Sequence, residues 1–190
     1  MLEQRVQLHA KLWKILNATR ASDYQKEHVL GLVLYRYLSQ DFSAFFNTRI
    51  NNESLKYENL SDEEFNTLVC KENIVEIIKE KGLFMYPSQL FCNVLKSFKK
   101  NQEPSLGLYL DNIFKQIENP LNTLELESDG FVERHFFGLF NNVSLNKIGI
   151  TNDASNQQAN LASQNESIEG LIKIIAEIDD FNEGGGGKSP

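Results

Sequence analysis

The C-terminal tail is the first place where residue types and spacing suggest chemistry. It contains Gly187-Lys188-Ser189, which are also the closing residues of a phosphate-binding loop. That loop requires a Gly five positions before Gly187, where Asn182 stands, and it requires a helix afterwards. The tail is therefore interpreted as a flexible linker rather than as a nucleotide site.

The histidines and cysteines could bind a metal ion only if their spacing brought several of them together. His9, His28 and His135 are isolated from one another and from Cys70 and Cys92. No metal-ligand pattern results, and each histidine is more simply a surface or core-edge residue. Two distant cysteines are typical of a reducing compartment, and we expect both thiols to lie in the core.

Acidic clusters could supply a general acid and a general base. The candidates are Asp62-Glu63-Glu64 at a helix start and Asp179-Asp180 near the tail. A helix dipole stabilises carboxylates at a helix start, and those near the tail are explained by solvation. Catalysis would also need a shaped pocket, which nothing in the sequence outlines. No residue is therefore assigned a catalytic, cofactor-binding or metal-binding role.

Basic residues near the N-terminus could meet phosphate groups. Residues 1–50 carry seven Lys or Arg against four acids, a net +3 in a chain whose formal charge is −7. Lys11, Lys14 and Arg20 are the candidate contacts for DNA or for an acidic partner surface, although a solvated helix face is the simpler explanation. The negative total argues against a protein that coats nucleic acid by itself.

A series of helices must position these side chains. Residues 2–17 place apolar side chains at three- and four-residue steps, the period of an amphipathic helix. The stretch from Tyr24 to Phe46 has no Pro, follows a capping box at Ser22, and contains an apolar run too short to cross a bilayer. It predicts a central helix covered on several sides, in which Gly31 marks the close approach of another helix.

The central helix and the segment before it also hold the predicted core. The core residues are Trp13, Leu30, Leu34, Leu38 and Phe42. The same region carries a series of aromatic residues that could also stack on nucleic-acid bases. They are Tyr24, Tyr35, Tyr37, Phe42, Phe45 and Phe46. Its helical spacing favours core packing instead.

Capping signals mark the later helices. Ser61 opens a short helix, an apolar stretch ends at Gly82, Pro87 and Pro104 each start a helix, and residues 166–181 outline a last one. Residues 121–150 are loop-rich and could include a short strand. The sequence predicts an all-α, compact multi-helix domain over residues 1–183, with a C-terminal helix and a flexible tail at 184–190. Without a membrane segment or a secretion signal, we expect a cytoplasmic location.

Four stretches, taken in order, resemble a known family. They are LWKILNATR (12–20), DYQKEHVLGLVLYRYLSQDF (23–42), GLFMYP (82–87) and GLFNNVSLNKIG (138–149). This succession is similar to the N-terminal domain of the modification (M, HsdM) subunit of type I restriction–modification systems. Arg36 stands where the family often has Lys, and Asn142 replaces a usual acidic residue.

The resemblance implies a role in assembly. In the family this helical domain precedes a Rossmann-like domain that binds S-adenosylmethionine and uses an Asn-Pro-Pro-Phe or Tyr motif to methylate adenine N6 in DNA. Neither that motif nor a glycine-rich cofactor motif occurs here. The implied partners are the specificity (S) subunit, a second M subunit, the restriction (R) subunit and DNA in the complex. The alternative is a stand-alone helical interaction or regulatory module without a catalytic domain.

Overall fold

The computed structural model describes residues 26–49, 55–128, 135–143, 145 and 157–177. In these parts the regular elements are all helical, and no strand occurs. The α-helices are α2 (Lys26–Arg49), α3 (Asp62–Leu68), α4 (Lys71–Lys81), α5 (Val94–Asn101), α6 (Leu106–Glu118), α7 (Pro120–Thr123) and α8 (Gln157–Ala176), with 3-10 helices η1 (Tyr57–Asn59) and η2 (Pro87–Gln89). The all-α prediction is confirmed.

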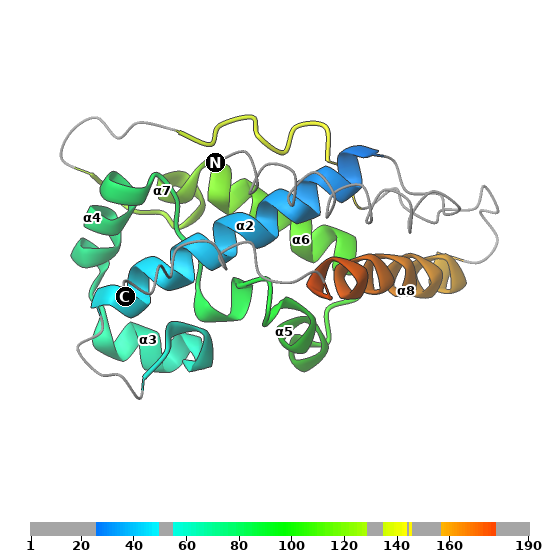
Figure 1. Ribbon diagram of the computed structural model, residues 1–190, viewed down its shortest axis with the longest axis horizontal. Coiled ribbons are helices and arrows are strands. Elements are labelled where there is room, and N and C mark those ends of the chain that lie inside the picture. Colours follow the sequence, from blue (N-terminus) through cyan, green and yellow to red (C-terminus); the bar gives the residue numbers. More distant parts are fainter. Residues whose placement is uncertain (1–25, 50–54, 129–134, 144, 146–156, 178–190) are drawn as a thin grey trace, which may run out of the picture.

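Helix α2 organises the packing. Its 24 residues span about 36 Å at 1.5 Å per residue. It runs diagonally across the molecule in Figure 1, with α6 behind it, α8 near its first half, and α3 and α4 near its end. The apolar run that begins at Val29 therefore belongs to a helix, as predicted. None of the described helices has the length and apolar content needed to cross a bilayer.

The residues of α2 that were predicted to lie in the core differ in how far they are buried. Leu38 and Phe42 are buried, and Leu34 is half-buried against the core. Leu30 is 50% exposed, so its assignment to the core is wrong. The run of apolar residues is wider than the inner face of the helix, and Leu30 lies on the outer side of that run. Trp13 lies outside the described residues.

An aromatic cluster fills the core between the end of α2 and α3. Phe42 is fully buried, and its ring contacts those of Phe46, Tyr57 and Phe84 at centroid distances of 5.3, 5.8 and 5.7 Å. Phe46 stacks on Tyr57 at 4.3 Å. These rings pack against one another in the interior, which favours the core interpretation over base stacking. Within the same series Tyr37 is the exception, because it is half exposed.

Three of the helix boundaries follow their sequence signals. At Ser61 the hydroxyl accepts from the Glu64 amide at 3.1 Å, and the Glu64 carboxylate accepts from the Ser61 amide at 2.7 Å, which completes the capping box. Gly82 ends α4 with a φ of +73°, a conformation that favours Gly. Ser105 caps α6 by accepting from the Leu108 amide.

Two boundaries differ from the prediction. After Pro87 the chain makes only η2, and α5 begins at Val94, because the Phe91 amide donates to the Ser39 hydroxyl of α2 at 2.8 Å instead of continuing a helix. Helix α8 begins at Gln157, earlier than the start predicted at residue 166, and so includes part of the polar stretch before it. Its Asn165 side chain accepts from the Leu106 amide at 2.8 Å, so tertiary bonds recruit polar residues into the helix.

The segment predicted to be loop-rich, residues 121–150, contains the end of α7 and turns in its described parts, and no strand occurs there. This segment also supplies the close neighbour of Gly31. A Cβ added at Gly31 would lie 2.5 Å from a methyl group of Val143, so a turn segment rather than a helix presses on α2 there. Both cysteines are exposed, and the expectation of core thiols is wrong.

Two buried phenols make the fold sensitive to alkaline pH. Tyr57 donates to the Met85 carbonyl at 2.6 Å, and Tyr35 donates to the Gln89 carbonyl. Burial raises the pKa of both hydroxyls above the usual value, and for Tyr57 the charge of Asp62 adds to this. A raised folded-state pKa means that the neutral phenol stabilises fully below the unfolded pKa of about 10 and that this contribution is lost as pH rises further.

We therefore expect the free energy of unfolding to fall above about pH 10, by about 1.4 kcal/mol per pH unit for each buried phenol. Urea titrations of the wild type and of Tyr57→Phe across that range check this. The variant should show the shallower decline, whereas Tyr37→Phe, at an exposed position, should follow the wild type. Equal slopes for wild type and Tyr57→Phe would contradict the expectation.

Candidate interaction surface

The described residues contain no group of three or more His, Cys, Asp or Glu placed to hold a metal ion. The three basic residues proposed as DNA or partner contacts, Lys11, Lys14 and Arg20, lie outside the described residues. The functional surface must therefore be sought among the exposed groups of the helices.

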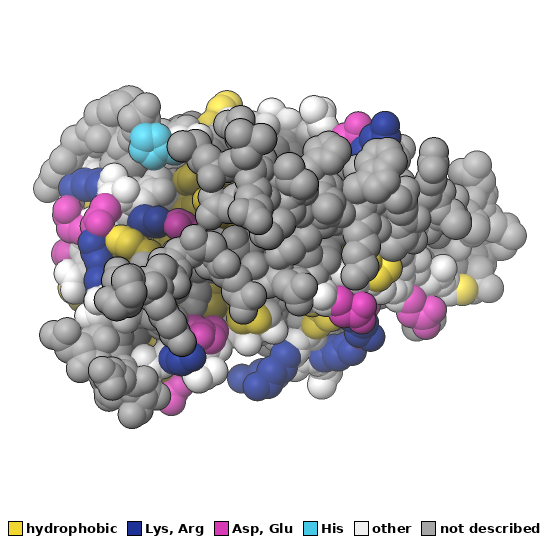
Figure 2. Space-filling model, in the orientation of Figure 1, with side chains coloured by type: hydrophobic (Ala, Val, Ile, Leu, Met, Phe, Trp, Pro, Cys, Tyr) yellow, Lys and Arg dark blue, Asp and Glu magenta, His cyan; other side chains and the backbone are white. Residues whose placement is uncertain are grey.

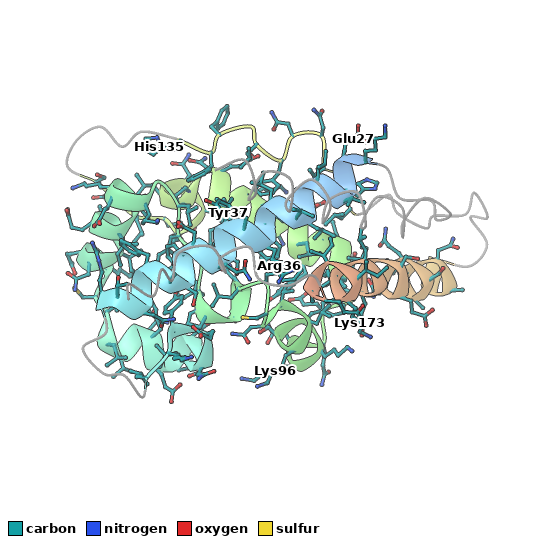
Figure 3. The ribbon with its side chains drawn as sticks, in the orientation of Figure 1. Glu27, Arg36, Tyr37, Lys96, His135 and Lys173 are labelled. Carbon is teal, nitrogen blue, oxygen red and sulfur yellow. The ribbon has the colours of Figure 1, made fainter. Side chains whose placement is uncertain are left out.

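A ridge of lysines runs along one edge of the molecule. Lys96, Lys99 and Lys100 lie on α5, at spacings that bring their side chains to neighbouring positions, and Lys173 lies on α8. We call these four residues the lysine ridge. Figure 2 shows basic side chains gathered along the lower edge of the molecule, and Figure 3 places Lys96 and Lys173 there.

One carboxylate lies at the centre of the ridge and partly neutralises it. Glu169 of α8 accepts from Lys99 and from Lys173, both at 2.8 Å. These two hydrogen bonds hold the pKa of Glu169 below its usual value. Because both lysines share one anion, the trio keeps a net positive charge, and it ties α5 to α8.

The other two lysines of the ridge face an acidic cleft. This cleft, about 370 Å³ in volume, lies between α3 and α5. Its charged lining is Glu58, Asp62, Glu63, Glu64, Lys96 and Lys100. Asp62 accepts from the Ser88 amide at 2.9 Å and from the Ser88 hydroxyl at 2.6 Å, so it is held in place by η2.

The acids of the cleft are also bonded within the fold. Glu58 accepts from Ser43 at 2.7 Å and from Asn47 at 2.9 Å, and these bonds, with the charge of Lys56, keep its pKa low despite the opposing effect of burial. Glu58 therefore keeps its charge in the cleft that Lys96 and Lys100 also line. A surface that alternates both signs matches a protein partner of complementary pattern better than it matches a uniformly negative phosphate backbone.

Helix α8 is bonded to neighbouring parts of the fold at two points along its length. Near its middle, the Asn165 amide donates to the Pro104 carbonyl at 3.0 Å. Near its end, the buried guanidinium of Arg36 donates to the Ile175 carbonyl (Figure 3). A cation at a helix C-terminus interacts favourably with the helix dipole. The lysine ridge therefore lies on two helices, α5 and α8, and these hydrogen bonds hold α8 in its position.

Sequence reasoning missed this surface. In the sequence, the α5 lysines are explained by the favourable interaction of cations with a helix C-terminus, and no pattern singles out Glu169. The available signal for a basic surface was the presence of three lysines at neighbouring helical positions, with no acidic residue in α5. The cross-helix role of Glu169 had no signal in the sequence, because Lys99 and Glu169 lie 70 residues apart.

Comparison with known proteins identifies the chain's relatives. The methylase subunit of the type I restriction enzyme MpnII of Mycoplasma pneumoniae is 34% identical to it over 192 residues. That alignment covers 95% of this chain and 32% of the relative. No protein-family model and no solved structure matches the chain. The resemblance found in the sequence is therefore confirmed: over nearly its full length, this chain is related to part of a type I restriction methylase (M) subunit, and it spans about a third of that relative's length.

Proposed function

We propose that this chain is the N-terminal assembly domain of an M subunit in a type I restriction–modification system. In this proposal the domain helps to close the multisubunit complex around DNA, and the full protein transfers a methyl group from S-adenosylmethionine to adenine N6. The observation that carries the proposal is the similarity to a methylase subunit along 95% of the chain.

The proposal places cofactor binding outside this domain. A nucleoside cofactor in a doubly wound fold is held where a strand runs into a glycine-rich turn. The described residues contain helices and turns without a strand, and they do not fit such a site. In this proposal, the role of the domain itself is to hold the partner subunits in position.

Within the proposal, the lysine ridge contacts another subunit, and DNA is contacted by the N-terminal residues Lys11, Lys14 and Arg20. The support for this division is electrostatic. Carboxylates lie among the ridge lysines, whereas residues 1–50 carry a net +3. Complementary charge patterns set the specificity and rate of protein association, and clustered cations set salt-dependent DNA affinity.

The double variant Lys96→Glu, Lys100→Glu tests the division in the full-length protein. We expect it to lower the affinity for the partner subunits about ten-fold or more, because two attractive contacts become repulsive. The salt dependence of DNA binding by the assembled complex should stay unchanged. The variant Lys71→Glu, Lys79→Glu on α4 is the matched control, since it makes the same charge change on another helix. A loss equal in both variants, or a reduced salt slope in the ridge variant, would contradict the assignment.

The cofactor assignment has a separate test. The parent reading frame beyond Glu183 should continue into a glycine-rich cofactor motif and an Asn-Pro-Pro-Phe or Tyr. Titration calorimetry should detect S-adenosylmethionine binding by the full-length protein and none by these 190 residues. Binding by the 190-residue chain would overturn the assembly-only role, and a reading frame without those motifs would favour the stand-alone helical module.

A further inference from the structure

Another cleft, also about 370 Å³ in volume, lies between the start of α4 and the chain that follows α7. Figure 1 shows α4 and α7 side by side at one end of the molecule. The walls of the cleft are apolar and consist of Val69, Ile74, Tyr86, Leu124 and Leu126. We call this cleft the α4–α7 pocket. Small-molecule sites are mostly apolar clefts of about 300–1,000 Å³, and the pocket falls within that range.

The walls of the α4–α7 pocket are held by contacts within the fold. The ring of Tyr86 packs edge-on against those of Phe84 and Phe65, at centroid distances of 5.0 and 5.8 Å. The Leu126 amide donates to the Leu121 carbonyl at 2.9 Å, which fixes the chain after α7. Walls that are already fixed lose little conformational freedom when a ligand binds, so less of the binding free energy is lost to ordering.

The polar part of the lining favours an anion. The strong hydrogen-bond donors are the Asn66 amide and the Lys71 ammonium. Among the lining residues, all of which the structure describes, Lys71 alone carries a charge, and it is exposed. Glu72 is not part of the lining, and its carboxylate accepts from its own amide and from the Cys70 thiol. One cation beside apolar walls complements a ligand that has an apolar body and a single negative group.

We propose that the α4–α7 pocket binds a small amphipathic carboxylate, with its hydrocarbon part against Leu124 and Leu126 and its carboxylate beside Lys71 and Asn66. Burial of the hydrocarbon supplies most of the affinity, and the charge-assisted hydrogen bond from Lys71 supplies the preference for an anion. A bound ligand also covers Cys70, which lines the same pocket. This inference does not depend on the function proposed above.

Cys70 reports occupancy directly, because its thiol is exposed and lines the pocket. In the chain that carries Cys92→Ser, alkylation of Cys70 by iodoacetamide should slow as octanoate is added below the concentrations that form micelles. Octanoate at about ten times its dissociation constant should slow the reaction about ten-fold, since only the ligand-free chain reacts. Octanol, which has the same number of carbons and no charge, should protect Cys70 less. In the chain that carries Cys70→Ser, alkylation of the exposed Cys92 should not change, because Cys92 does not line the pocket.

Two variants separate the polar and apolar parts of the site. Lys71→Met removes the charge and should make protection by octanoate equal to protection by octanol, whereas Lys79→Met on the same helix should keep the preference for octanoate. Leu126→Phe fills the pocket and should abolish protection by both compounds. Leu161→Phe, at a 38% exposed position on α8, is its matched control and should leave protection unchanged. Circular dichroism should confirm that each variant is folded, and the Lys71→Met comparison decides the result if Leu126→Phe is not.

Four outcomes would contradict this site. Alkylation of Cys70 that octanoate does not slow would overturn the proposal, and so would equal protection of Cys70 and Cys92, because that result indicates non-specific binding. Equal protection of the wild-type pocket by octanol and octanoate would overturn the assignment of an anionic ligand. Protection of Cys70 that appears only after a partner subunit is added would overturn it in favour of a protein.

Discussion

Replacing Phe42 with Ala should lower the free energy of unfolding by about 3–5 kcal/mol. The side chain is fully buried, and its ring contacts four other aromatic rings, those of Phe45, Phe46, Tyr57 and Phe84. Removing it leaves a cavity that rigid neighbouring rings cannot fill, so both the transfer free energy and the packing of the cluster are lost. Urea titration followed by far-ultraviolet circular dichroism measures the change.

Phe137→Ala is the matched control for this substitution. Phe137 is 66% exposed, so the same loss of a ring should change stability by no more than about 0.5 kcal/mol. A Phe42→Ala variant that loses less than about 1 kcal/mol would show that the aromatic cluster does not hold the end of α2 to α3.

Replacing Arg36 with Ala should cost about 3 kcal/mol, the second large effect. Its guanidinium is buried and donates to the Ile175 carbonyl near the end of α8. Truncation leaves that carbonyl without its charged donor, removes a favourable interaction with the helix dipole, and opens space under α8. Arg36→Lys keeps the charge and should lose less.

Arg49→Ala serves as the control for Arg36→Ala. Arg49 pairs with Glu80 in an exposed position, where ion pairs contribute about 0–1 kcal/mol. Hydrogen exchange should show that Arg36→Ala, and not Arg49→Ala, accelerates the exchange of amides in the last turns of α8. Equal effects of the two variants would mean that α8 is held by its contacts with α6 and not by Arg36.

The hydrogen bond from Arg36 to the Ile175 carbonyl should also affect assembly with partner subunits. The lysine ridge spans α5 and α8, and the Glu169 bridge fixes their relative position at that edge. If Arg36 holds α8 to α2, its loss should weaken partner binding through the ridge without any change in the ridge residues. That effect would be indirect, since Arg36 is buried and cannot itself touch a partner.

Local signals in the sequence determined the helical class and several boundaries. The capping box at Ser61, the left-handed Gly82 and the cap at Ser105 depend on residues within a few positions of one another. The apolar period located the face of α2 that holds Leu38 and Phe42. The ordered stretches that resemble M subunits also lie in the sequence, and the similarity to the MpnII methylase subunit agrees with them.

The tertiary structure alone decided the features that join distant residues. It placed Leu30 outside the core and left both cysteines exposed. It also moved the start of α5 to Val94, because the Phe91 amide donates to the Ser39 hydroxyl instead of joining a helix. It also brought Glu169 between Lys99 and Lys173. The physical reason is that helical periodicity defines which residues share a face, whereas the neighbours packed around the helix decide whether that face is buried, bonded or left open.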